Sequence, residues 1–575
     1  MTSTTPTKTA GQLTTERIAR ETAEITAIYE TLFPTQKLSF LLHEGQDSTW
    51  GHPHVIEGPV TFNPGHLDAY YLGRFQRPGA HPAAPEITVS ISIPPRPLPS
   101  ELAQTDAPWQ PQRQLRLLYP LSPLAYEDIR YRAEMLRKRR SEQRHSRKSL
   151  PRGKESGLFA QPQAPASDLR PAILIGMHWL EVGGAEKLAF DTITWALEAG
   201  LRVFVVAGVA SQQRLADRLP DHPDLRFIRL DRYLPYHLWA RYVEQLVLTQ
   251  NIRLIHIHHC RQLYDALPHL RVTTPWVQVI DSTHIVEHAD GGYPRISGVW
   301  SEFIDLHHVI SGELIDYYRD VFHVLGKVRL GRMLDRDDSR SLPALNMTPG
   351  TSELRVAFVG RLYYQKRPVV VVEALRALSI WARNNGVALK ATLVGEGPFL
   401  GAIQHLLRRY GLAETVSLLP AGTDVPALLR QSDVLLLPSN NEGLALVCYE
   451  AIEQGCIPIS TDVGSQDEVV PADLLLPLPP RQSVQGIVMA VDNLWRDPAF
   501  LERQQAQMQR LWARLSQDPT ARELLLPIYR RVADAGDAGL TDSGPQDAGA
   551  EAAADPAPQT TANAAAEDLI KDFSQ

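Results

Sequence analysis

Short apolar runs alternate with longer amphipathic stretches through the middle of this sequence, and this alternation restricts the fold more than any other feature. Each run is too short for a helix and mostly apolar, as expected for a strand in a parallel sheet that is covered on both faces. Strands that alternate with helices predict a doubly wound α/β sheet. The first set of predicted strands covers residues 172–176, 203–207, 226–230, 254–258, 276–280 and 308–310.

The alternation stops in a polar, glycine-containing stretch at residues 325–351 and then starts again. Two parallel sheets joined by a linker predict two Rossmann-like domains that face each other across a cleft, and such interfaces commonly hold ligands. We place the first domain at 170–330, the linker at 331–352 and the second domain, with its closing helices, at 353–533. The second set of predicted strands covers residues 355–359, 391–394, 415–418, 434–437 and 457–461.

The amino-terminal part, residues 1–124, does not share this alternation. A helix is predicted at 16–32 and a half-buried strand at 87–93, with a proline-rich stretch around the latter, so we expect a small α+β appendage without an assigned role. The spacing of its histidines fits no metal-ligand pattern, which favours scattered surface or core side chains. These histidines are His43, His52, His54 and His66.

Two further segments differ in composition. Residues 125–169 begin as a predicted helix and carry a cluster of Lys and Arg between 137 and 154. Such a cluster is attracted to an anionic membrane surface by about 1 kcal/mol per charge, and a solvated linker is the alternative. Residues 534–575 are rich in Ala, Asp, Gly, Pro and Thr, which predicts a disordered acidic tail.

The overall composition narrows the class of protein. The 575 residues include 58 basic and 65 acidic side chains, for a net charge of −7, which gives no reason to expect nucleic-acid binding. Cys260, Cys448 and Cys456 have no CxxC spacing, so we expect buried thiols in a reducing compartment. No apolar run approaches the roughly 20 residues that cross a bilayer. We therefore expect a cytoplasmic protein, with peripheral contact to the inner membrane face as an option.

The segment 440–455 has the strongest functional signal. It follows the predicted strand 434–437, makes a polar loop and continues into a helix expected at 444–454, which Gly455 ends. Loops at the carboxyl ends of parallel strands are where open α/β sheets bind ligands. Glu442 is therefore expected at the mouth of the cleft, with Glu450 about two helical turns further along.

Cations and glycines follow other strands at the same predicted edge. Arg361 and Lys366 come after the strand 355–359, and a diphosphate leaving group needs such positive charges as its bond breaks. Gly395 begins another strand-to-helix turn. Gly183 and Gly184 occupy the corresponding position in the first domain, where they would let main-chain amides approach an anion, although an ordinary tight turn explains them equally well.

These motifs, in this order and at this spacing, resemble the retaining glycosyltransferases of family 4, which have the GT-B fold and a Glu-x7-Glu motif. The resemblance covers roughly residues 170–530 and is strongest over 355–470. It implies transfer of a sugar from a nucleoside diphosphate sugar to an acceptor hydroxyl, with retained anomeric configuration. It also implies no bound metal and no cofactor beyond the donor substrate. Synthesis of a surface polysaccharide or glycolipid, on a glycan or lipid-linked acceptor, is the expected setting.

The resemblance also implies a role for each residue. Arg361 and Lys366 would neutralise the donor diphosphate, Glu442 would lie near the donor sugar, Glu450 would bind the ribose hydroxyls, and His284 would position the reacting groups. The remaining donor-binding positions are Gly183, Gly184, Gly395, Gly443, Leu444, Ala445 and Leu446, the last four through amides that begin a helix.

The sequence departs from the family pattern at two places. Ala445 stands where many members have Gly, and the interdomain segment 330–335 lacks the usual crossover motif. The loop 286–298 is unusual and either reads the acceptor or closes over the site. Two other classes of protein stay open: a non-catalytic glycan-binding or scaffold protein, and a nucleotide-sugar epimerase or phosphorylase with the same two-domain fold. A purely structural alternative is also open, in which Glu442 and Glu450 are a helix cap and a surface helix residue and Arg361 and Lys366 are solvated.

Overall fold

A computed structural model of the chain describes residues 15–45, 53–61, 71–93, 108–144, 167–181, 184–211, 213–287, 290–333 and 342–534. The described residues all belong to one compact unit within Met1–Gly536. The predicted acidic tail beyond Asp534 lies outside the described residues. The part of the Lys and Arg cluster that falls at 145–154 also lies outside the described residues.

The amino-terminal appendage is α+β, as predicted. Helix α1 packs against a small mixed sheet whose described strands pair in the order β2-β4-β1-β3. Helix α1 also contacts α7 of the first Rossmann-like domain, and the Tyr29 hydroxyl donates a hydrogen bond to the Tyr233 carbonyl oxygen at 3.0 Å. The appendage therefore shares a hydrophobic core with that domain. Its elements are α1 (Thr15–Leu32), β1 (Lys37–Glu44), β2 (His54–Glu57), β3 (Tyr71–Arg77) and β4 (Glu86–Ile93).

The first Rossmann-like domain has a parallel sheet, in which the described strands pair in the order β11-β10-β9-β8-β5-β6-β7. The strands are β5 (Ala172–Met177), β6 (Arg202–Ala207), β7 (Leu225–Ile228), β8 (Ile252–His258), β9 (Gln278–Thr283), β10 (Leu306–Val309) and β11 (Val328–Leu330). The helices are α5 (Gly184–Glu198), α6 (Leu230–Tyr233), α7 (Trp239–Gln250), α8 (Arg261–Thr273), α9 (Gly292–Val299) and α10 (Gly312–Phe322). Each predicted strand overlaps an observed one, because fully buried parallel strands leave continuous apolar runs in the sequence.

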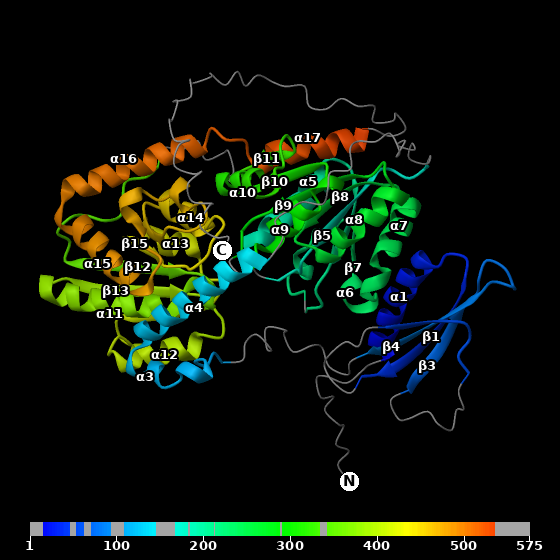
Figure 1. The fold of residues 1–575 in the computed structure, drawn as a ribbon, viewed down its shortest axis with the longest axis horizontal. Helices are drawn as coiled ribbons and strands as arrows, with labels where there is room; N and C mark the ends of the chain where they lie inside the picture. Colours follow the sequence, from blue (N-terminus) through cyan, green and yellow to red (C-terminus); the bar gives the residue numbers. More distant parts are fainter. Residues whose placement is uncertain are drawn as a thin grey trace, which may run out of the picture. The chain divides into compact units, whose positions relative to one another are not determined.

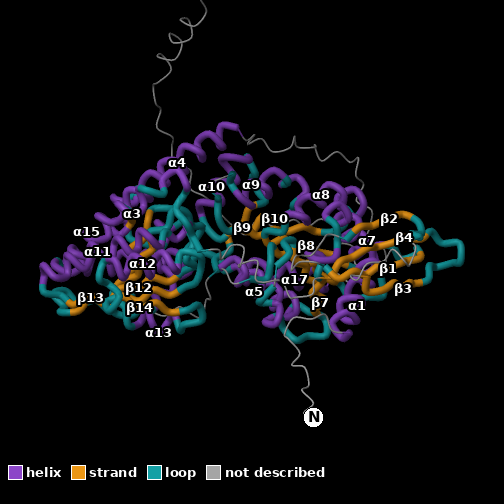
Figure 2. Tube along the Cα trace, turned by 90° about the horizontal axis from the view of Figure 1, so that it is seen from below, coloured by secondary structure: helices purple, strands orange, loops and turns teal. Residues whose placement is uncertain are grey.

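The second domain repeats this architecture, with the described strands in the order β14-β13-β12-β15-β16-β17 and helices on either side of them (Figure 2). The strands are β12 (Glu353–Val359), β13 (Ala388–Val394), β14 (Val416–Leu419), β15 (Val434–Leu437), β16 (Ile457–Thr461) and β17 (Leu475–Leu476). The helices are α11 (Pro368–Asn385), α12 (Leu400–Arg409), α13 (Val425–Arg430), α14 (Leu446–Glu453), α15 (Pro480–Arg496) and α16 (Pro498–Leu515). The predicted two-domain α/β fold is thus confirmed.

Three helices pack on a domain other than the one expected from their place in the chain (Figure 1). Helix α17 (Ala521–Asp534), expected to close the second domain, packs against α5 of the first domain. Helix α3 (Leu118–Leu121), expected in the appendage, and helix α4 (Pro123–Arg144), expected in a linker, pack on the second domain, α4 against α11 and α15 and α3 against α4. Buried apolar side chains explain both placements, with Leu525 and Tyr529 in one core and Tyr126 in the other.

The crossover between the two domains is held by Arg332. Its guanidinium pairs with Glu468 of the second domain and donates to Asp518 at 2.7 and 2.9 Å and to the Ile310 carbonyl oxygen at 3.2 Å. The Arg332 main chain also bridges to Thr520, so two chain segments cross between the domains side by side. Arg332 belongs to the segment 330–335, which lacks the usual crossover motif, and its ion pairs connect the two domains at this point.

Candidate active site

Lys366 and Glu442 meet as a buried ion pair. Strand β12 runs into a loop and a 3-10 turn, Tyr364–Lys366, before Pro368 begins α11. The Lys366 Nζ lies 2.6 Å from the Glu442 Oε1, and the two side chains are 17% and 7% exposed. Two predicted site residues that are 76 positions apart in the sequence are thus in direct contact.

Main-chain hydrogen bonds hold the two loops together around this pair. The Asn440 amide donates to the Gln365 carbonyl oxygen at 2.8 Å, and the Gln365 side-chain amide donates to the Asn441 carbonyl oxygen at 2.9 Å. Gln365 was not among the predicted site residues, and Asn440 was predicted only as part of the segment 440–455. Asn440 is 3% exposed and lies three residues after the buried strand β15.

Helix α14 begins at Leu446, two residues later than predicted, because the Ala445 backbone is extended (φ −79°, ψ 100°). Gly443 and Leu444 therefore precede the helix, and the prediction that all four amides from 443 to 446 begin it is wrong. Gly455 adopts φ +74° directly after the helix, as expected for a residue that ends it.

Gly443 touches the opposite domain. A Cβ at this position would lie 1.7 Å from the His284 carbonyl oxygen, so only glycine fits here without displacing main chain. The neighbouring Asn441 side chain donates to the Val286 carbonyl oxygen at 3.2 Å. The two domains therefore meet at the loop between β15 and α14.

Charged groups of the second domain also face helix α5 of the first. Glu450 is half-buried on α14; burial raises the pKa of its carboxyl, and the positive charge of Lys187 on α5 opposes that shift. Burial likewise raises the pKa of Glu186, while Trp179 donates a hydrogen bond to it at 2.8 Å and the charge of Arg361 stabilises its anion. Arg361 is exposed. Arg361 and Glu450 thus lie at the junction of the domains.

Two of the other predicted donor-binding glycines, Gly395 and Gly184, lie in different structural settings. Gly395 has φ +150°, and a Cβ there would lie 2.0 Å from the Gly360 carbonyl oxygen, so it permits close packing of two strand-to-helix loops. Gly184 begins α5, whereas Gly183 lies outside the described residues.

His284 belongs to a histidine cluster that sequence analysis missed. His178, His259 and His284 each directly follow a strand, and these strands, β5, β8 and β9, are neighbours in the sheet. The His259 ring lies 4.9 Å from the His284 ring and stacks on Tyr293 at 4.6 Å, and the His178 Nδ1 lies 2.9 Å from the Tyr293 hydroxyl. The repeated placement of a histidine just after a strand was a signal in the sequence.

Burial keeps these imidazoles neutral. It lowers the pKa of His284 well below its usual range, with a further contribution from His259, and it lowers the pKa of His259 to about 3. The His284 Nε2 is buried and has no hydrogen-bond partner among the described residues. An unpartnered buried nitrogen at a domain junction is available for a hydroxyl group of a ligand.

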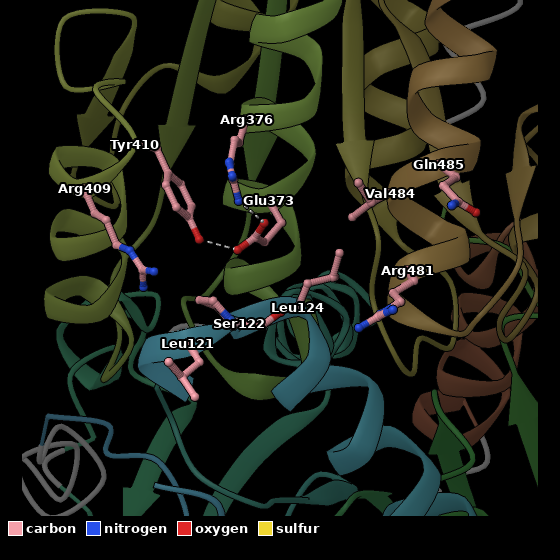
Figure 3. A pocket seen from close by; sticks show the side chains of 11 residues that line it. Leu121, Ser122, Leu124, Glu373, Arg376, Arg409, Tyr410, Arg481, Val484 and Gln485 are labelled. Carbon is pink, nitrogen blue, oxygen red and sulfur yellow. Dashed lines mark hydrogen bonds and ion pairs between the residues drawn. The ribbon is translucent and has the colours of Figure 1, made fainter. Parts of the chain in front are cut away.

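Other potential sites do not involve the predicted residues. A cavity of about 590 Å³ lies where α4 begins, against α11, α12 and α15, and none of the predicted site residues lines it (Figure 3). Within the described ranges, no group of three or more His, Cys, Asp or Glu side chains is placed to hold a metal ion. The prediction of a metal-independent reaction stays a prediction.

Comparison with known proteins gives a family match within the second domain and similarity to several glycosyltransferases. Residues 348–510 match the family of group 1 glycosyl transferases. The chain is 31% identical over 206 residues to a D-inositol 3-phosphate glycosyltransferase of Rhodococcus erythropolis, covering 35% of this chain and 45% of that protein. It is 31% identical over 155 residues to the Escherichia coli glycosyltransferase WcaL, assigned to colanic acid biosynthesis, covering 26% of this chain and 37% of WcaL. The chain thus spans less than half the length of these relatives.

Among solved structures, sucrose-phosphate synthase from Thermosynechococcus elongatus aligns with 21% identity and a TM-score of 0.46, covering 64% of this chain and 100% of that one. The family match includes Arg361, Lys366, Glu442 and Glu450. The greater part of the second domain thus matches group 1 glycosyl transferases, and the four residues lie within the matching segment.

Proposed function

We propose that this protein is a retaining glycosyltransferase that moves a sugar from a nucleoside diphosphate sugar to an acceptor hydroxyl, in the synthesis of a surface polysaccharide or glycolipid. The buried Lys366–Glu442 pair carries this proposal. It lies inside the segment that matches group 1 glycosyl transferases and at the loop where the two domains meet. An ion pair with both members largely removed from water is costly unless it has a use, which favours a functional role over a structural one.

The donor would bind with its diphosphate between Arg361 and Lys366. The bond from the anomeric carbon to the phosphate oxygen breaks as the bond to the acceptor oxygen forms, and the acceptor proton passes to the departing phosphate on the same face of the sugar. Arg361, Lys366 and the first amides of α14 stabilise the growing negative charge. Glu442, released from Lys366, lies near the positive charge that develops on the sugar, and Glu450 binds the ribose hydroxyls.

The acceptor would bind on the side of the first domain. The unpartnered Nε2 of His284 offers a hydrogen bond to a hydroxyl group there. The segment predicted as a loop at 286–298 is largely helical, because α9 begins at Gly292. Tyr293 of α9 packs on the histidine cluster, and the Val286 carbonyl oxygen accepts from Asn441. These contacts favour Val286 and α9 as the elements that read a glycan or lipid-linked acceptor.

Contact with an anionic membrane surface through residues 137–154 is a further part of the proposal. Arg137, Arg139 and Arg140 lie on α4 and are exposed. No helix within the described ranges is long and apolar enough to cross a membrane. Co-sedimentation with vesicles of phosphatidylglycerol, compared with vesicles of phosphatidylcholine, tests this contact, and neutralising the three arginines should abolish any difference.

The function is tested by incubating the protein with a panel of nucleotide sugars, with and without glycan and lipid-linked acceptors, and measuring release of nucleoside diphosphate. Release that requires an acceptor, with the anomeric configuration of the product retained by NMR and no loss of rate in EDTA, is expected. An altered free nucleotide sugar would indicate an epimerase instead, and binding without turnover across the panel would indicate a glycan-binding protein.

A further inference from the structure

The segment 108–144, named the strap below, is built into the second domain although it precedes the first domain in the chain. The Trp109 ring stacks on Phe399 at 4.6 Å and an interplanar angle of 20°, and its main-chain amide donates to the Pro398 carbonyl oxygen at 2.9 Å. Tyr119 and Tyr126 are buried in the core of the second domain. The strap therefore contacts the loop that follows β13.

The middle of the strap contacts the loop that carries Lys366. The Arg130 guanidinium carbon lies 3.3 Å from the centre of the Tyr364 ring, and the Tyr364 hydroxyl donates to the Glu134 Oε2 at 2.7 Å. Tyr364 is the first residue of the 3-10 turn that ends at Lys366. A charge-assisted hydrogen bond and a cation over the ring fix the orientation of this turn.

The same Glu134 oxygen also faces the second catalytic loop. The Asn440 side-chain amide lies 3.5 Å from it, at the outer limit of a hydrogen bond, and Asn440 is two residues before Glu442. One carboxylate of the strap thus lies between the loop of Lys366 and the loop of Glu442. Asn440 is buried, so the amide has little access to water as an alternative partner.

We propose that the strap is an integral part of the donor site and that Glu134 is a positioning residue, which sets the Lys366 turn relative to the Glu442 loop. The effect on catalysis rests on the proposed function, whereas the effect on the loops does not. The strap lies outside residues 348–510, so the match to group 1 glycosyl transferases does not account for it. Helix α4 also reaches the first domain, where burial raises the pKa of Glu313 to about 7 and the charge of Lys138 opposes this.

The start of α4 offers a matched control. Asp128 accepts a hydrogen bond from the Arg481 main-chain amide at 3.1 Å and pairs with its guanidinium at 2.8 Å. Arg481 belongs to the wall of the cavity at this end of the helix, on α15 (Figure 3). Asp128→Asn therefore weakens the attachment of the same helix to the same domain without touching the Tyr364–Glu134 contact.

Three variants test the proposal in the full chain: Tyr364→Phe, which removes only the hydroxyl, Glu134→Leu, which removes the acceptor, and Glu134→Gln, which keeps an acceptor oxygen. Amide hydrogen exchange of the ligand-free protein is measured over 361–367 and 439–446. We expect exchange in both segments to rise about two- to tenfold in Tyr364→Phe and Glu134→Leu, as for the loss of one hydrogen bond. The exchange rates in Glu134→Gln should be closer to those of the unchanged protein, and Asp128→Asn should leave the exchange of both segments unchanged.

Donor kinetics give the second measurement. Tyr364→Phe and Glu134→Leu should have a kcat about three- to tenfold below that of the unchanged protein. Their KM for the acceptor should stay unchanged, because only the donor loops are displaced. Unaltered exchange in both segments, or an equal rise in Asp128→Asn, would overturn the positioning role. If the unchanged protein turns over no donor, the proposed function fails, and the exchange measurement still decides the role of the strap.

Discussion

Removal of the Lys366 charge should separate the catalytic role of this residue from its role in stability. In the ligand-free structure its ammonium group is the partner of a Glu442 carboxylate that is only 7% exposed. Lys366→Met keeps the length of the side chain but leaves that carboxylate without its ion-pair partner. Lys366→Met combined with Glu442→Gln removes both charges and leaves two neutral side chains of similar size.

The two measured quantities should respond differently. Breaking a buried pair on one side typically costs about 3–5 kcal/mol of the free energy of unfolding, whereas replacing both partners is close to neutral. Loss of one preorganised donor to a leaving group lowers turnover by about a hundredfold or more. The single variant should therefore be both less stable and slow, and the double variant should recover most of the stability while staying slow.

Urea denaturation followed by tryptophan fluorescence gives the stability, and release of nucleoside diphosphate gives the turnover. Lys390→Met is the control, because Lys390 pairs with Glu353 at 2.7 Å in the same domain but both side chains are exposed. Such a surface pair contributes about 0–1 kcal/mol. Recovery of turnover in the double variant would refute the reasoning, since Lys366 would then serve only to hold Glu442.

Three further predictions follow from single contacts. Gly443→Ala places a Cβ 1.7 Å from the His284 carbonyl oxygen and should lower turnover at least tenfold, whereas Gly401→Ala, with open space at the Cβ, should not. Burial raises the pKa of Glu127 from 4.5 to about 7, so the contribution of this residue to the free energy of unfolding falls by about 3 kcal/mol as the pH rises from 4.5 to 7. Glu127→Gln should therefore be more stable than the unchanged protein at pH 8 and about equally stable at pH 4.5. Denaturation at both pH values measures this difference. Arg332→Ala should lower the free energy of unfolding by about 3 kcal/mol or more, and Arg332→Lys by less, by the same measurement.

The parts of the fold that could be predicted are those that leave a local pattern in the sequence. Buried parallel strands leave apolar runs, which is why β12 and β15 were found almost residue for residue. The strands β1 and β3 were missed because Ser39 interrupts the apolar run of β1, and β3 is only partly buried. A half-exposed strand has no continuous apolar run, and its pairing depends on partners that the local sequence does not specify.

The start of α14 shows how tertiary contacts override local preference. Leu444 and Ala445 are good helix formers, so the helix was expected to include them. The Gly443 carbonyl oxygen instead accepts a hydrogen bond from the Ser465 amide at 2.9 Å, and the glycine packs on the main chain of His284. These contacts hold the loop extended and delay the helix by two residues. The position of the strap could not be predicted for the same reason, because Glu134 and Tyr364 are in contact although they are 230 residues apart in the sequence.

The distribution of charge at the junction explains why the prediction for the donor side is more detailed than the prediction for the acceptor side. Arg361 and Lys366 are side chains whose charge the sequence itself states, and a diphosphate requires such charges. His284 is different, because burial holds its pKa well below neutrality and removes any positive charge that the sequence would allow. A neutral imidazole distinguishes ligands by the direction of one hydrogen bond rather than by charge. Under the proposed function, recognition on the acceptor side would depend on the orientation of side chains such as Tyr293, which only the packed cluster defines.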